Sequence, residues 1–287
     1  MPSTGDDSVA RTIEASALAG LATRSLLHPI DTCKTVIQVS TSQGGSRSLI
    51  SSALNITREH GIRGLYRGFV PAVAGTVPGV ALYFTSFHLF KNRIEFLYPN
   101  KPHLTNFCAG FLAEVVSCMI WVPTDVLKER AQASAIRDSV RIPTGSSLRS
   151  VVSAEGLRGL YRGYGATLAS FGPFSAFYFM FVEQFKLWTK SCVQRDELKF
   201  YELVPVCAVA GGSAAFLSAP LDLVKVRMQV ERSSNSSYSG FLPALSRVYR
   251  VEGLRGLFRG GGSRVWFAVP NTAITMSLME SIRHRLE

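Results

Sequence analysis

The sequence contains three copies of one proline motif at a nearly constant spacing. In each copy an aspartate follows the proline by two residues, a lysine by five and a glutamine by nine, and the prolines are Pro29, Pro123 and Pro220. A second motif, Gly-x-Arg-Gly-Leu-(Tyr/Phe)-Arg-Gly, begins at positions 61, 156 and 253. Repetition at a fixed period indicates equivalent structural units that pack together. We therefore expect one domain built from three repeats, residues 1–100, 101–197 and 198–287.

Long uncharged stretches recur with the same period. Residues 68–90, 163–182, 203–221 and 265–279 contain no Asp, Glu, Lys or Arg, and two further apolar stretches, about 12–38 and 103–132, are broken by internal charges such as Arg24 and Glu114. A helix needs roughly 20 mostly apolar residues to cross a bilayer. The pattern predicts an all-α membrane protein with six transmembrane helices, two per repeat. The polar segments between them then lie on one side, with short helices at 48–59 and 241–251.

The placement of charge separates two classes of protein. The chain is 47% hydrophobic and 18% charged, with a formal net charge of +11, which suits a membrane protein with basic loops or a nucleic-acid binder. Residues 39–67, 133–162 and 230–259 each carry a net charge of +3. The positive-inside rule places these three segments in the inner compartment. The basic surplus is therefore loop charge, and no nucleic-acid partner is expected.

Enzyme chemistry has no support in the sequence. The five cysteines show no CxxC spacing, and there is no nucleophile–base arrangement, metal-ligand cluster or phosphate-binding loop. We expect no enzymatic activity, no resident metal site and no cofactor.

The proline motif places its polar residues on one helical face. At 100° per residue, Asp, Lys and Gln lie at about 200°, 140° and 180° from the proline. Ionisable residues in a membrane are kept away from lipid, so this face lines water or a partner. Arg24 and Glu114 share it. They form either an ion pair with each other or a mixed-charge site for a zwitterionic or cationic solute. His28, Arg130 and Arg264 are further candidates.

Three copies of Pro-x-Asp-x-x-Lys, each followed by an aromatic-basic-Gly motif, resemble the mitochondrial carrier family over the whole chain. The resemblance implies a pseudo-threefold bundle of six helices around a central cavity. It also implies a monomeric, multi-pass carrier of the mitochondrial inner membrane, open alternately to each side, with cardiolipin bound near the second motif. The implied matrix gate consists of the pairs Asp31–Lys128, Asp125–Lys225 and Asp222–Lys34, with Gln38, Gln132 and Gln229 as braces.

The same resemblance implies a second gate at the cytoplasmic end of the second transmembrane helix of each repeat. Its acid–base positions are His88 and Lys91, Glu183 and Lys186, and Glu280 and Arg283. His88 stands where the family has an acid. Only two of the three ion pairs can form, so we expect this gate to be weaker than the matrix gate.

Family contact positions for the solute lie seven and eight residues beyond the last glycine of the second motif. With Arg24 and Glu114, the predicted substrate-binding residues are Gly75, Thr76, Ser170, Phe171, Phe267 and Ala268. No Arg or Lys triad occupies these positions. Nucleotides and di- or tricarboxylates, which need several fixed cations, are therefore disfavoured.

Two stretches resemble particular branches of the family. Residues 113–132, including Glu114, and residues 75–78 resemble S-adenosylmethionine carriers, which have a basic and an acidic residue where this chain has Ser170 and Phe171. Residues 263–275 resemble mitoferrins, which move iron, and related divalent-metal carriers. We expect exchange transport of S-adenosylmethionine. The alternatives are transport of a divalent metal (iron or magnesium) and a non-transporting membrane receptor or scaffold.

Overall fold

The structure is a computed structural model of the 287-residue chain, described for residues 4–40, 48–97, 102–134, 148–195, 197–231, 238 and 240–286. Side chains are described for the same residues except 4–11, 102, 103 and 283–286. Within these ranges the regular secondary structure is helical, and no strand occurs. The protein is therefore all-α, as predicted.

Six long helical segments correspond to the six apolar stretches. They are α1 (Thr4–Val39), α4 with α5 (Phe69–Ala74 and Thr76–Leu97), α6 (Pro102–Ala133), α8 (Tyr164–Val193), α9 with α10 (Phe200–Leu217 and Ala219–Val230) and α12 (Gly261–Leu286). Two are interrupted. The segment around Gly75 bends by 40°, and α9 ends at Ser218, just before Pro220 in the first turn of α10. Proline cannot donate the helical hydrogen bond, which explains a break there.

Several helices extend beyond the uncharged stretches because charged residues continue them. For example, α8 runs on through Glu183 and Lys190 to Val193. By length and hydropathy alone, three described helices can cross a membrane, or four if the bent pair Ile62–Ala74 and Thr76–Leu97 is one span. Helices α1 and α12 do not meet that measure. The repeat pattern, rather than hydropathy, identifies them as the remaining members of the set of six transmembrane helices.

Short helices connect the long ones within each repeat. They are α2 (Leu49–His60) with α3 (Ile62–Leu65), α7 (Leu148–Leu160) and α11 (Phe241–Leu257), and they include the two short helices predicted at 48–59 and 241–251. The first glycine of the second motif has the same left-handed backbone in every repeat, with φ of 66°, 68° and 68° at Gly61, Gly156 and Gly253. Glycine adopts such angles without steric cost. The repeated motif therefore encodes a repeated kink within the helical connection of each repeat.

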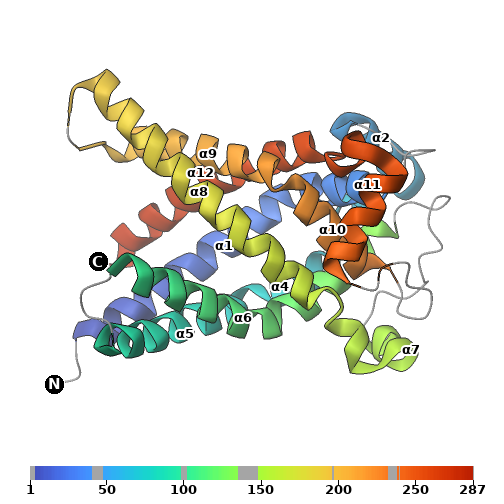
Figure 1. The fold of residues 1–287 in the computed structure, drawn as a ribbon, viewed down its shortest axis with the longest axis horizontal. Helices are drawn as coiled ribbons and strands as arrows, with labels where there is room; N and C mark the ends of the chain where they lie inside the picture. Colours follow the sequence, from blue (N-terminus) through green and yellow to red (C-terminus); the bar gives the residue numbers. More distant parts are fainter. Residues whose placement is uncertain are drawn as a thin grey trace.

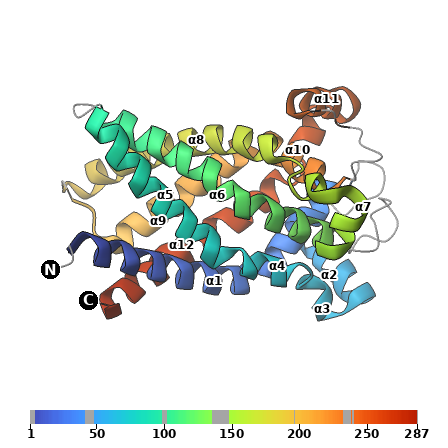
Figure 2. The same cartoon turned by 90° about the horizontal axis from the view of Figure 1, so that it is seen from below.

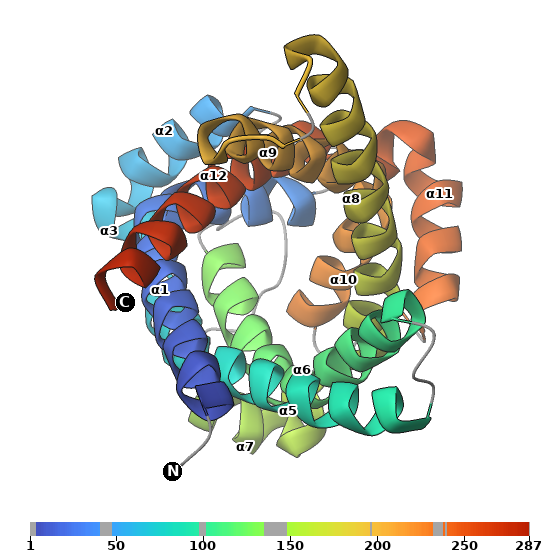
Figure 3. The same cartoon turned by 90° about the vertical axis from the view of Figure 1, so that its left-hand side faces the viewer.

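The long helices form a closed ring, in the order α1, α5, α6, α8, α9 and α12, and α12 packs against α1 (Figure 3). Both chain termini lie at one end of the bundle, which we call the terminal end (Figure 1). Helices α2, α7 and α11 lie at the opposite end, which we call the loop-helix end (Figure 2). The described parts of the three polar segments thus share one side, as predicted.

Candidate functional site: a charged network at one end of the bundle

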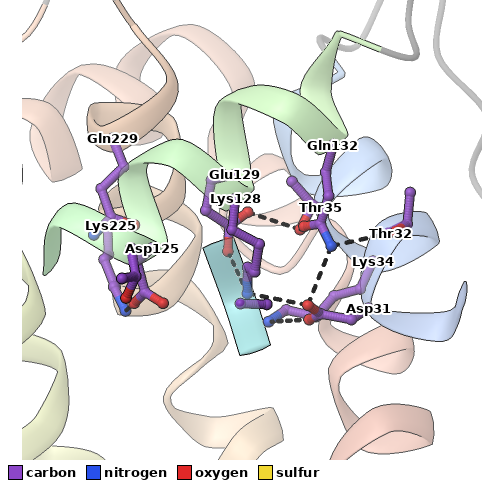
Figure 4. A network of polar contacts seen from close by, with 12 residues as sticks. Asp31, Thr32, Lys34, Thr35, Asp125, Lys128, Glu129, Gln132, Lys225 and Gln229 are labelled. Atoms are coloured by element: carbon purple, nitrogen blue, oxygen red, sulfur yellow. Dashed lines mark hydrogen bonds and ion pairs between the residues drawn. The ribbon is translucent and has the colours of Figure 1, made fainter. Parts of the chain in front are cut away.

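Three aspartate–lysine contacts join the repeats at the loop-helix end. Nζ of Lys128 lies 3.0 Å from Oδ2 of Asp31, and Nζ of Lys225 lies 2.9 Å from Oδ2 of Asp125. The third pair is longer, with 3.7 Å between Lys34 Nζ and Asp222 Oδ2. Figure 4 shows the first two pairs converging from α1, α6 and α10. Each pair links the proline-motif helix of one repeat to that of another, and these helices are α1, α6 and α10. Together the three pairs hold the ring closed at this end.

The glutamines of the proline motif take different roles. Gln132 donates to Asp31 Oδ2 at 3.3 Å and to Thr32 Oγ1 at 3.2 Å. Gln38 donates to Asp222 Oδ2 at 3.0 Å. Gln229, in contrast, donates to Thr167 Oγ1 at 3.4 Å. Two of the three predicted braces therefore hold a gate carboxylate, while the third bonds to α8.

Two charged residues that interrupt the threefold pattern complete the network. Glu129, which is 4% exposed, lies 3.2 Å from Lys128 Nζ and accepts a hydrogen bond from Thr35. Arg264 Nε lies 3.1 Å from Asp222 Oδ2. Neither contact was predicted, although both residues stand beside repeat motifs and differ from their counterparts in the other repeats. Buried charges need partners, and each of these two neutralises a neighbour.

Buried arginine–glutamate pairs join the proline motif to the short helices in repeats two and three. Arg130 pairs with Glu155 through two bonds, and Arg227 pairs with Glu252 in the same way. Arg130 Nε also donates to the backbone oxygen of Gln229 at 3.0 Å. Arg130 was a candidate solute contact from its position in the sequence, but its side chain is 3% exposed and is bonded to Glu155 and to the backbone of Gln229. It is a structural residue.

Repeat one has an apolar contact in place of this pair. Val36 stands at the arginine position and packs with Cys33 and Ile56, while His60 stands at the glutamate position. The C-terminal end of α6 then receives a donor from another motif, because Arg67 Nη1 donates to the backbone oxygen of Ser134 at 2.9 Å. Cations at a helix C-terminus satisfy otherwise unpaired carbonyls.

The predicted cytoplasmic gate lies at the terminal end. Among Lys91, Glu183 and Lys186, whose side chains the structure describes, no acid pairs with a base, and His88 packs edge-on against Phe87 with ring centroids 5.7 Å apart. Glu280 has an interaction of its own, and the side chain of Arg283 lies outside the described residues. The three Asp–Lys contacts between repeats lie at the loop-helix end.

The solute contact positions are mostly engaged in helix packing. A side chain at Gly75 would meet Thr124 of α6 at 2.6 Å. Thr76 and Ser170 are buried, and each hydroxyl donates at 2.8 Å to the carbonyl oxygen of the residue four positions earlier. Phe171, Phe267 and Ala268 are partly exposed, and Lys34 Nζ lies 5.4 Å from the centre of the Phe267 ring.

Arg24 and Glu114 do not pair with each other in the described structure. Arg24 lies over the Trp121 ring, 4.8 Å from its centre, and donates to the backbone oxygen of Ala72 at 3.3 Å. The Glu114 carboxylate accepts a bond from Cys118 Sγ at 3.5 Å. Of the two predicted alternatives, the mutual ion pair between Arg24 and Glu114 is therefore absent from this structure. His28 bonds to the backbone oxygen of Arg67 and stacks on Tyr66, which indicates a packing role.

Three helical repeats around one axis, tied by ion pairs between successive repeats, define a membrane carrier of pseudo-threefold design. The sequence profile described as "Mitochondrial carrier protein" matches residues 5–96, 99–191 and 196–287. The chain therefore belongs to the mitochondrial carrier family, whose members transport solutes, and it is a multi-pass mitochondrial membrane protein.

Individual relatives cover almost the whole chain. The Mitochondrial S-adenosylmethionine carrier protein of Danio rerio is 34% identical over 275 residues, 95% of this chain and 96% of the relative. The S-adenosylmethionine mitochondrial carrier protein homolog of Drosophila melanogaster is 36% identical over 259 residues, 88% of this chain and 84% of the relative. Mitochondrial substrate carrier family protein E of Dictyostelium discoideum is 31% identical over 286 residues, 95% of this chain and 94% of the relative.

Proposed function

We propose that the protein carries S-adenosylmethionine across the mitochondrial inner membrane by exchange, with the loop-helix end facing the matrix. The observation that carries the proposal is Glu114. It lies near the middle of α6, and no described basic side chain pairs with its carboxylate. An ionisable residue inside a membrane span marks a functional site by default.

The chemistry of the solute matches this environment. S-adenosylmethionine carries a sulfonium, an ammonium and a carboxylate, so a single fixed acid can hold its cationic part. Arg24 supplies a cation on the neighbouring α1, and Trp121 supplies an aromatic face. Similarity to S-adenosylmethionine carriers of two animals supports the same choice.

Alternating access supplies the mechanism. In this structure the Asp–Lys pairs bind α1, α6 and α10 together at the loop-helix end, while Lys91, Glu183 and Lys186 form no such pair with one another at the terminal end. This arrangement fits a state closed toward the matrix. Turnover would break the matrix pairs and form those of the cytoplasmic gate.

Cardiolipin is the lipid that we propose at the junction of repeats three and one. A pocket of about 860 Å³ lies between α2, the end of α11 and the start of α12. Arg255 and Arg259 contribute positive charge, and Ile37 and Trp266 contribute apolar surface. Anionic headgroups with acyl chains suit such a lining. The carrier would act as a monomer, without a nucleic-acid partner or a resident cofactor.

Transport of a divalent metal is the second candidate. Glu114 and Cys118 present an oxygen and a sulfur 3.5 Å apart, and both are metal-ligand types. No group of three or more such ligands occurs among the described residues. A metal cargo would therefore need water or further ligands recruited during transport. A non-transporting receptor would retain the fold but show no flux.

The deciding experiment measures uptake of labelled S-adenosylmethionine, Fe²⁺ and Mg²⁺ into liposomes that contain the purified protein. We expect S-adenosylmethionine to exchange above the protein-free background and faster than either metal. Glu114→Gln and Arg24→Ala should abolish exchange without loss of fold, whereas Glu95→Gln, at an exposed position of α5, should not. Flux of a metal alone would support the second candidate, and no flux of any solute would support a receptor.

A further inference from the structure

Asp222 differs from the equivalent aspartates, Asp31 and Asp125, in having an arginine among its partners. Its Oδ2 atom lies 3.1 Å from Arg264 Nε, 3.0 Å from Gln38 Nε2 and 3.7 Å from Lys34 Nζ. The lysine contacts at the other two junctions are 3.0 and 2.9 Å. Arg264 thus holds the position that the threefold pattern gives to Lys34. The junction of repeats three and one is closed by an arginine from α12.

Arg264 also contacts the break between α9 and α10. Its Nη1 atom lies 3.1 Å from Oγ of Ser218, the residue between α9 and α10. One side chain therefore joins α12, the break and the gate carboxylate. The positions equivalent to Arg264 in repeats one and two are Ala72 and Thr167, so these three connections exist in repeat three alone.

Arg264 lies about one helical turn before two predicted solute contacts in α12. Phe267 and Ala268 follow Arg264 by three and four residues in α12, and residues at those spacings share a helix face. Phe267 also contacts Lys34, whose ammonium lies 5.4 Å from the ring centre. The Arg264 side chain is 13% exposed and that of Asp222 is 14% exposed. The pair is thus partly accessible, one helical turn from where a solute would lie.

We propose that Arg264 determines specificity for a solute carboxylate and couples its binding to release of the gate. This inference rests on the proposed function. A carboxylate next to Phe267 accepts the guanidinium bonds that now go to Asp222, because arginine binds carboxylates through two parallel hydrogen bonds. Asp222 then keeps only the longer Lys34 contact and Gln38. The solute thereby replaces the bond that holds α12 to α10, and this junction opens first.

The test compares S-adenosylmethionine with the analogue in which hydrogen replaces the carboxylate. Initial exchange rates of both compounds are measured in liposomes for the unsubstituted protein, Arg264→Gln, Arg264→Lys and Arg250→Gln. Arg250 is an exposed arginine of the same repeat and serves as the matched control. We expect the unsubstituted protein and Arg250→Gln to prefer the carboxylate compound at least tenfold in kcat/KM. Arg264→Gln should reduce that preference to about one, and Arg264→Lys should give an intermediate value.

A purely structural role for Arg264 gives a different result. Both compounds would then slow by the same factor in Arg264→Gln, and an unchanged preference would overturn the proposal. An unsubstituted protein without preference would overturn it as well, while leaving the proposed function intact. Absence of exchange with either compound would instead remove the proposed function and this inference together. Thermal unfolding of each variant identifies loss of fold, and if Arg264→Gln does not fold, the preference of Arg264→Lys decides.

Discussion

Lys128 contacts two carboxylates at once, with its Nζ atom 3.0 Å from Asp31 and 3.2 Å from Glu129. The Lys128 side chain is 11% exposed and those of its partners are 9% and 5% exposed. Gln132 donates to the same oxygen of Asp31. At the junction of repeats one and two, Lys128 is therefore shared between two buried acids, and Asp31 has a longer contact of 3.8 Å with Lys34 as well.

Lys128→Gln should be the most damaging substitution in the gate. It leaves the buried Glu129 carboxylate without its lysine and Asp31 with only one lysine contact, at 3.8 Å to Lys34, and removing one partner of a buried ion pair costs about 3–5 kcal/mol. We expect a lower apparent unfolding temperature in detergent and loss of exchange, with substantial recovery in Lys128→Arg. Lys190→Gln, near the end of α8, is the matched control. Equal unfolding temperatures for the two glutamine variants would contradict the assignment.

The arginine–glutamate pairs of the short helices allow a comparison between repeats. Glu252→Gln leaves Arg227 buried without its carboxylate and should lower the free energy of unfolding by about 3–5 kcal/mol. His60→Gln alters the equivalent position of repeat one, where Val36 packs apolar neighbours, and should cost about 1 kcal/mol or less. Thermal unfolding of both variants under one set of conditions measures the difference. Similar losses would mean that the pair is not the source of stability.

Repetition explains how much of the site could be predicted. A motif that occurs three times fixes the phase of each helix, so Asp31, Lys128 and their counterparts were expected on one face and were found paired between repeats. Glu129 and Arg264 could not be found in this way. Each occurs once, and each has a partner on a neighbouring helix, Thr35 for Glu129 and Asp222 for Arg264. Their contacts depend on how α1, α6, α10 and α12 converge, which no single helical pattern contains.

The predicted solute contacts show a related limit. Counting residues from the second motif gives a position along the transmembrane segment that follows it in each repeat. It does not give the direction in which the side chain points. Thr76 and Ser170 are at the expected positions along their segments, yet both hydroxyls bond to the backbone carbonyl four residues earlier. The uncharged stretches likewise located the apolar centre of each span. They did not locate its ends, because charged residues prolong the helices toward water.

A glycine in the second motif should tolerate no side chain. Gly68 has φ of 78°, and a β-carbon there would lie 2.7 Å from the backbone oxygen of Lys128. The left-handed conformation alone costs about 1–2 kcal/mol for other residues, and a backbone contact cannot move aside. We expect Gly68→Ala to lower both unfolding temperature and exchange. Gly165→Ala, where nothing lies within 4 Å, should be neutral. A stable, active Gly68→Ala variant would show that this junction can separate without cost.

His88→Glu should slow turnover by supplying the acid that repeat one lacks at the terminal end. The added carboxylate can pair with a lysine of the predicted cytoplasmic gate, such as Lys186, when that end closes. A partly exposed pair contributes about 0.2–1 kcal/mol, which corresponds to a slowing of up to about fivefold, because the pair must break each time the end reopens. Exchange at saturating solute measures the effect. His88→Gln, which removes the ring without adding charge, is the control, and the two variants turning over at equal rates would show that the missing acid does not limit the cycle.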